Sequence, residues 1–161
     1  MIVRIALAMS FLLLLAACSA ARPATPTPGT TPTAGVVGNP DPCSLITEAE
    51  LTAILGESMA EDGSDSLICR WTASGEALPL ISIGFEAGNL SDAKAGLANP
   101  ADITVGGLPA VVGALFMEGD ILYVARDNIR LWVNLPYVPR DTPEVRQQLI
   151  QIAETAVSRW R

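Results

Sequence analysis

Apolar residues recur at helical spacing in two segments, one near residue 50 and one at the end of the chain. In the first, Thr47 and Glu50 have the spacing of a capping box, and the apolar stripe that follows ends at Gly56. In the second, Thr142 and Pro143 have the order of a helix start, and apolar residues repeat helically from there to the terminus. We predict a helix over each segment, with one buried face.

Apolar and polar residues alternate between these two helices, which is the period of half-buried strands. A short helix capped by Ser91 is predicted to interrupt the alternation. Residues 103–105 are predicted to be an extended segment that leads into the third strand. The dipeptides at 118–119 and 127–128 suit tight hairpin turns, which makes the last three strands an antiparallel meander. The order predicts an α+β domain whose antiparallel sheet packs against an N-terminal and a C-terminal helix. About five strands are expected, near residues 67–72, 81–85, 110–117, 121–126 and 129–135.

The first seventeen residues are almost wholly apolar after one early positive charge, Arg4, as in a secretory signal. They lead into Leu15-Ala16-Ala17-Cys18, which resembles the lipobox of bacterial lipoproteins, where the cysteine is alkylated by diacylglycerol and the chain is cut before it. The apolar run is too short to span a bilayer. We expect a signal peptide over 1–17 and a lipid anchor on Cys18 that holds the protein at the outer face of the cell membrane. A plain signal peptide, with the cysteine incidental, is the alternative.

Residues 19–40 are rich in Pro, Thr, Ala and Gly and contain no aromatic residue. Such a segment cannot bury enough apolar surface to offset the entropy of ordering it, and its prolines favour an extended spacer. We expect residues 18–40 to be the lipidated cysteine with a disordered tether, and residues 41–161 to be a single domain. A proline-rich ligand for an aromatic groove, or a glycosylated Thr/Pro stalk, is the alternative for the tether.

The amino-acid composition disfavours several classes of function. Seventeen acidic residues against ten basic ones give a formal charge of -7, which disfavours nucleic acid as a partner. Histidine is absent, and with it the commonest general base and the commonest zinc ligand. We therefore expect a protein that is not an enzyme, with no catalytic residues, no cofactor and no metal.

Cys43 and Cys69 remain as an even pair once Cys18 carries the lipid. Disulfides persist in exported proteins, so the count argues for a bond between them. A redox or nucleophilic thiol is the alternative, but neither a C-x-x-C spacing nor a histidine partner is present.

The predicted domain contains four short sequence motifs. They are Asp41-Pro42-Cys43-Ser44-Leu45-Ile46-Thr47, Leu55-Gly56, Cys69-Arg70-Trp71 and Val105-Gly106-Gly107-Leu108-Pro109-Ala110. With the lipobox and the Thr/Pro-rich linker, they resemble the bacterial lipoprotein domain of unknown function 3558. The resemblance covers nearly the whole mature domain and implies a Cys43–Cys69 disulfide. It implies no activity.

Two groups of residues could carry chemistry. Ser91 and Lys94 have the S-x-x-K spacing that places a lysine one helical turn from a serine nucleophile, but the companion motifs of those enzymes are absent. A helix cap beside a solvated lysine is the simpler interpretation. The segment 61–66 gathers three carboxylates and two hydroxyls, the hard oxygens that calcium prefers, without the ligand pattern of an EF-hand. A solvated loop is the simpler interpretation there.

Trp132 is the best candidate for recognition, because it alternates with the apolar face of its strand and stands beside Arg130. With Tyr123 or Tyr137 we expect it to form a patch that binds an envelope protein or a small ligand. The alternative is a sheet face covered by a helix or a loop.

These observations favour a membrane-tethered, extracytoplasmic binding or adaptor module of the cell envelope. A small hydrolase that uses Ser91 and Lys94, and a purely structural envelope protein, are the two alternatives.

Overall fold

The structure, a computed structural model, describes residues 38–76, 80–116, 119–136 and 142–160. All of them belong to the second of the two units into which the chain divides, Pro32–Arg161. The predictions for the signal peptide, Cys18, most of the tether and Tyr137 therefore lie outside the described residues.

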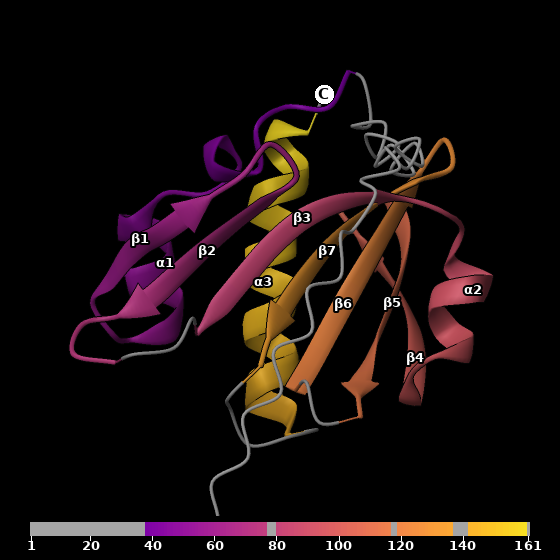
Figure 1. The fold of residues 1–161 in the computed structure, drawn as a ribbon. Helices are drawn as coiled ribbons and strands as arrows, with labels where there is room; N and C mark the ends of the chain where they lie inside the picture. Colours follow the sequence, from indigo (N-terminus) through magenta and orange to yellow (C-terminus); the bar gives the residue numbers. More distant parts are fainter. Residues whose placement is uncertain (1–37, 77–79, 117–118, 137–141, 161) are drawn as a thin grey trace, which may run out of the picture. The chain divides into compact units, whose positions relative to one another are not determined.

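Seven strands form one antiparallel sheet in the order β1-β2-β3-β7-β6-β5-β4 (Figure 1). They are β1 (Met59–Ser64), β2 (Ile68–Ala73), β3 (Ile81–Ala87), β4 (Ala98–Val105), β5 (Leu108–Leu115), β6 (Gly119–Arg126) and β7 (Ile129–Leu135). The helices are η1 (Pro42–Ser44), α1 (Glu48–Leu55), α2 (Leu90–Ala95) and α3 (Pro143–Arg159). None of these helices is both long and apolar enough to cross a membrane. The predicted α+β class and the antiparallel meander are confirmed.

Both long helices begin where the sequence predicts. The Thr47 side chain accepts a hydrogen bond from the backbone N of Glu50, and the Glu50 carboxylate accepts one from the backbone N of Thr47, which completes a capping box. Gly56, at φ 77°, ends α1, and Thr142 caps α3. The same Glu50 carboxylate pairs with Arg159 at the end of α3, with Nη2 and Oε1 2.6 Å apart. One acidic residue therefore caps α1 and links it to α3.

The hydrophobic core lies between one face of the sheet and the helices α1 and α3. α3 packs against β6 and β7, and α1 packs against β1 and α3 (Figure 1). Burying a large apolar side chain stabilises the fold by about 1.5–3 kcal/mol. The predicted apolar faces are confirmed, since the buried residues include Leu51, Cys69, Trp71, Ile81, Ile83, Phe85, Leu131, Val133, Leu135, Val145, Leu149, Ile152, Ala156 and Trp160.

A disulfide joins Cys43 in η1 to Cys69 in β2, which confirms the predicted pairing. Asp41 positions the first cysteine, because its carboxylate accepts a hydrogen bond from the backbone N of Cys43 at 3.0 Å. Pro42 occupies the first position of η1, where its missing N–H leaves no donor unsatisfied. The bond therefore fastens the chain entering the domain to the interior of the sheet.

Three expectations about secondary structure are corrected. Residues 59–64 form the edge strand β1, although residues 61–66 read as a loop; nearly all its side chains are exposed, so no alternation reveals it. β4 runs over Ala98–Val105 as a full edge strand and not only as an approach to the next one. Asn89, and not Ser91, caps α2, because its side chain accepts from the backbone N of Asp92 at 3.0 Å.

Candidate functional site: an open groove around Trp132

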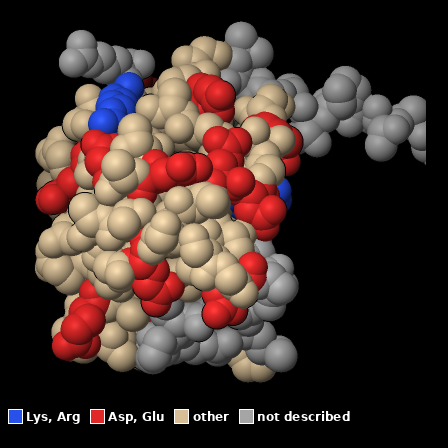
Figure 2. All heavy atoms as spheres, turned by 90° about the vertical axis from the view of Figure 1, so that its left-hand side faces the viewer, with Lys and Arg blue, Asp and Glu red and all other residues tan. Residues whose placement is uncertain are grey.

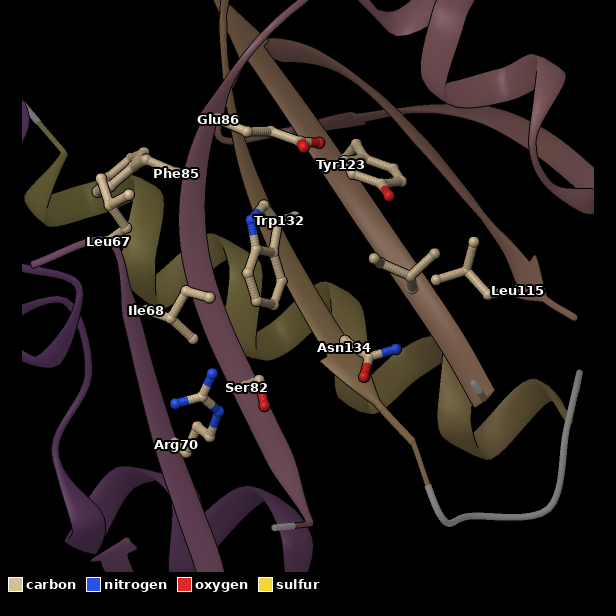
Figure 3. Close-up of a pocket in the computed structure, with 11 residues that line it drawn as sticks. Leu67, Ile68, Arg70, Ser82, Phe85, Glu86, Leu115, Tyr123, Trp132 and Asn134 are labelled. Atoms are coloured by element: carbon tan, nitrogen blue, oxygen red, sulfur yellow. The ribbon is translucent and has the colours of Figure 1, made fainter. Parts of the chain in front are cut away.

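The described residues cover only part of the sheet face opposite the core. α2 packs against β5 and β6, and Leu97 lies against Gly113 beside the fully buried Val111. Across β2, β3, β7 and β6 the face instead carries an open groove of about 410 Å³ (Figure 3). Small-molecule sites in proteins occupy about 300–1,000 Å³, so this groove has room for a small ligand.

Trp132 forms the floor of the groove. Its cross-strand partner on β3 is Gly84, and a Cβ added there would come within 2.5 Å of Cζ2 of the indole. Glycine at this position therefore makes room for the ring to lie against β3. Trp132 stays half-buried, with Leu67 and Ile68 on one side and Leu115 on the other (Figure 3).

A polar network closes one end of the groove. The Arg130 guanidinium pairs through Nη2 with Oε1 of Glu86 at 2.9 Å and donates through Nη1 to the carbonyl O of Asn89 at 2.9 Å. Its centre also lies 5.2 Å from the centroid of the Tyr123 ring, within the range of a cation–π contact. The Arg130 side chain is only 11% exposed, and these contacts hold it beside Glu86 and Tyr123, which line the groove.

Arg70 lies at the opposite end, near Ser82 and Asn134 (Figure 3). Ser82 is its cross-strand partner on β3, so both side chains stand on the open face. Within the described ranges, Arg70 forms no ion pair, in contrast to Arg130 and Arg159. Arg70 is a half-buried residue, and its five N–H donors are therefore left to solvent or to a ligand.

The structure brings together three of the four residues predicted for recognition. Trp132 and Tyr123 line the groove, and Arg130 stands beside Tyr123. Tyr137 lies outside the described residues. The alternative, a sheet face covered by a helix or a loop, is realised among the described residues over β5 and β6, where α2 packs.

Sequence reasoning missed the contribution of β2 to this site. The alternation of Ile68 and Arg70 with core residues places both on the open face. Their approach to Trp132, however, depends on the order β2-β3-β7, which joins strands far apart in the sequence. Leu67 alternates with Cys69 and Trp71, a pattern that predicts the core face for it. It precedes β2, however, in a turn held by Asp65, and it lines the groove.

The S-x-x-K residues are not arranged as a reactive pair. Lys94 forms an ion pair with Asp102 on β4, and Ser91 is exposed in the first turn of α2. Within the described residues, the Lys94 ammonium group contacts Asp102 and forms no hydrogen bond with the Ser91 hydroxyl, which a serine nucleophile activated by a lysine requires.

Carboxylates of the oxygen-rich segment 61–66 form hydrogen bonds within the β1–β2 hairpin. Asp62 Oδ2 accepts a hydrogen bond from the Thr72 hydroxyl at 2.8 Å, and Asp65 accepts two from backbone N–H groups of the following turn. Among the described residues, the group of potential metal ligands that lie close together is Glu61 with Cys43 and Cys69. Because those two cysteines form the disulfide, they offer no thiolate.

Acidic side chains gather over the side of the molecule formed by α1 and β1 (Figure 2). The segment from Asp41 to Glu76 contains eight acidic residues and a single basic one, Arg70, which accounts for the whole formal charge of -7. Acidic residues on the edge strand β1 also disfavour pairing with further strands. Arg70 is therefore an isolated positive charge within an acidic segment.

The comparisons with known proteins place the chain in a family and no further. No curated protein and no solved structure matches it. A family model described as "Protein of unknown function (DUF3558)" matches residues 13–158, which is nearly the whole chain and includes all four motifs noted above. The chain therefore belongs to the DUF3558 family.

Proposed function

We propose that this protein is a lipid-anchored binding module at the outer face of the cell membrane, and that its ligand or partner occupies the groove around Trp132. The observation that carries the proposal is the placement of Trp132 over Gly84 on the open sheet face. A large aromatic side chain with a polar edge is well suited to recognition, because it offers much contact area for little loss of rotamer freedom.

The lining of the groove supports binding. Its middle is apolar, through Ile68, Leu115 and Trp132, while hydrogen-bonding groups stand at both ends. Ligand sites combine these two features, since apolar contacts provide affinity and a few polar groups fix orientation. An open apolar surface of this kind also costs free energy in water, and an occupant would recover that energy.

The lack of a reactive pair in the described part of the chain supports binding over catalysis. Lys94 is engaged by Asp102, and no histidine exists anywhere in the sequence. The hydrolase alternative requires Ser91 and Lys94 to act together, so Lys94→Ala would have to abolish its activity.

The anchor is supported by the sequence and by the disulfide. Cys18 ends the apolar run where a lipobox requires it, and the Cys43–Cys69 bond suits an oxidising compartment outside the cytoplasm. Two acyl chains, at about 0.8 kcal/mol per buried methylene, would hold the protein stably at the membrane.

Intact-mass spectrometry of the protein from a bacterial membrane fraction tests the anchor. We expect a mature chain that begins at Cys18 and carries acyl groups, and we expect Cys18→Ala to be released from the membrane. Wild-type protein in the medium with an unmodified amino terminus would contradict the anchor.

Site-specific photocrosslinking in the native membrane tests the groove. A photoreactive amino acid at Ser82, inside the groove, is compared with the same residue at Ser158, which is exposed on α3. We expect one defined adduct from position 82 and none from 158. Adducts at neither position or equally at both would refute the groove as the binding site, and an adduct with a second copy of the chain would favour the structural alternative.

A further inference from the structure

We propose that the ligand of this groove is a single-tailed amphiphile with an anionic head group, the head contacting Arg70 and the tail lying over Trp132. This inference rests on the proposed binding function and names the chemical class of the ligand.

Arg70 favours a ligand with an anionic head group. Arginine guanidinium groups bind carboxylates, phosphates and sulfates through charge-assisted hydrogen bonds. Arg70 is the only arginine in the described residues for which no hydrogen bond or ion pair is seen; the others donate to backbone or carboxylate oxygens, namely Arg126, Arg130, Arg146 and Arg159. Arg70 is a half-buried residue at the end of the groove, next to Ser82 (Figure 3).

The opposite end of the groove does not compete for an anion. Its carboxylate, Glu86, is neutralised by Arg130, whose positive charge is in turn used by Glu86. One end is therefore electrically balanced, whereas the other holds Arg70, which forms no ion pair within the described residues. Charge complementarity orients an anionic ligand with its head at Arg70.

The middle of the groove favours a ligand with an apolar tail. Between Arg70 and Glu86, the apolar lining residues include Ile68 on β2, Trp132 on β7 and, further across, Leu115 at the end of β5 (Figure 3). None of these three can donate a strong hydrogen bond into the groove except through the indole N–H. A linear hydrocarbon chain therefore gains contact area here without leaving polar groups unpaired.

The acidic surroundings restrict the ligand further. The Asp62 carboxylate on β1 accepts a hydrogen bond from Thr72, which lies two residues from Arg70 on β2. The chain segment around Asp62 is strongly acidic. This field repels polyanions and anionic bilayer surfaces over a Debye length of about 8 Å. One negative charge in direct contact with Arg70 still gains hydrogen bonds, which favours a separate monoanionic molecule over a membrane surface.

The test uses three octyl probes that differ only in head group: octanoate, octanol and octyltrimethylammonium. The protein is the whole mature chain with Cys18→Ala, so that no acyl group of its own competes. The indole N–H resonances of the three tryptophans report binding, because Trp132 lies in the groove while Trp71 and Trp160 are buried in the core and serve as internal controls.

We expect all shifts to centre on Trp132 and octanoate to bind about tenfold more tightly than octanol, a preference that added salt weakens. Arg70→Gln should remove this preference, and Arg70→Lys should restore part of it. Lys94→Gln removes the same charge outside the groove and should leave the preference unchanged. Unchanged Trp71 and Trp160 resonances would show that each variant is folded.

Equal binding of octanoate and octanol, tighter binding of the cationic probe, or an Arg70→Gln variant that keeps the preference would each overturn the inference. So would a lack of any shift at Trp132. These outcomes leave the proposed function standing, because that function is judged separately by the adduct formed at position 82.

Discussion

Gly84 and Trp132 face each other across the β3–β7 pair, and the indole occupies the space that a side chain at position 84 would fill. The sheet therefore presents a tryptophan on its open face with a backbone strand beneath it. This pairing fixes the floor of the groove, and both proposals depend on it.

Gly84→Ala should disturb this floor. The added Cβ would lie 2.5 Å from the indole and 2.6 Å from the carbonyl O of Leu67, so either the ring or the strand must move. We expect the free energy of unfolding to fall by about 1–3 kcal/mol, measured by denaturant titration. Gly96→Ala is the matched control, because its nearest neighbour would lie at 3.6 Å, and it should be neutral or slightly stabilising. Equal stability of the two variants would show that the ring is not packed against Gly84.

Removal of the disulfide should weaken the fold without changing its architecture. The bond closes a loop across 26 positions, which corresponds to about 3 kcal/mol in the chain-entropy model. We expect the Cys43→Ala/Cys69→Ala double variant to lose about that much unfolding free energy. A reducing agent should lower the stability of the wild type and leave the double variant unaffected. If the reductant affected both proteins alike, the bond would not be the source of the difference.

The Glu50–Arg159 pair should make stability depend on pH in the acidic range. The hydrogen bond from Arg159, followed by that from the backbone of Thr47, lowers the pKa of Glu50 from 4.5 to about 2. Because the folded pKa is the lower one, the stabilisation is complete above about pH 4.5 and is lost as the pH falls towards 2. Both side chains are more than a third exposed, so solvent screening limits the contribution to about 1 kcal/mol.

Glu50→Gln tests this pair. We expect it to lower stability at pH 7 by about 1 kcal/mol and to flatten the stability profile between pH 4.5 and pH 2. Glu57→Gln, an exposed carboxylate change after α1, is the control and should keep the wild-type profile. A Glu50→Gln profile parallel to that of the wild type would contradict the assigned role.

The elements with strong local signals were predictable from the sequence. The capping box at Thr47, the glycine end at Gly56 and the Thr142-Pro143 start each involve residues that lie close together in the chain. The turn at 127–128 was equally predictable, since both Asp127 and Asn128 adopt positive φ, as a tight hairpin requires. Local chemistry alone determines these features.

The elements that depend on distant pairing were not predictable in the same way. β1 has no apolar alternation, and its backbone hydrogen bonds to β2 hold it in the sheet. The groove was only partly predictable for the same reason. The alternation along β7 places Trp132 on the open face, but the order of the strands in the sheet brings Arg70 to the same groove. A sequence pattern gives the face of a residue, whereas the neighbours across strands come from the tertiary fold.

Native mass spectrometry of the protein released gently from its own membrane shows whether the Trp132 groove is a ligand site. The wild type should carry a defined additional mass, and Trp132→Ala should lose it. Phe116→Ala removes an aromatic ring that is 86% exposed and lies outside the groove lining, and it should retain the additional mass. A bare wild-type chain, or an additional mass that persists in Trp132→Ala, would contradict a ligand site in this groove.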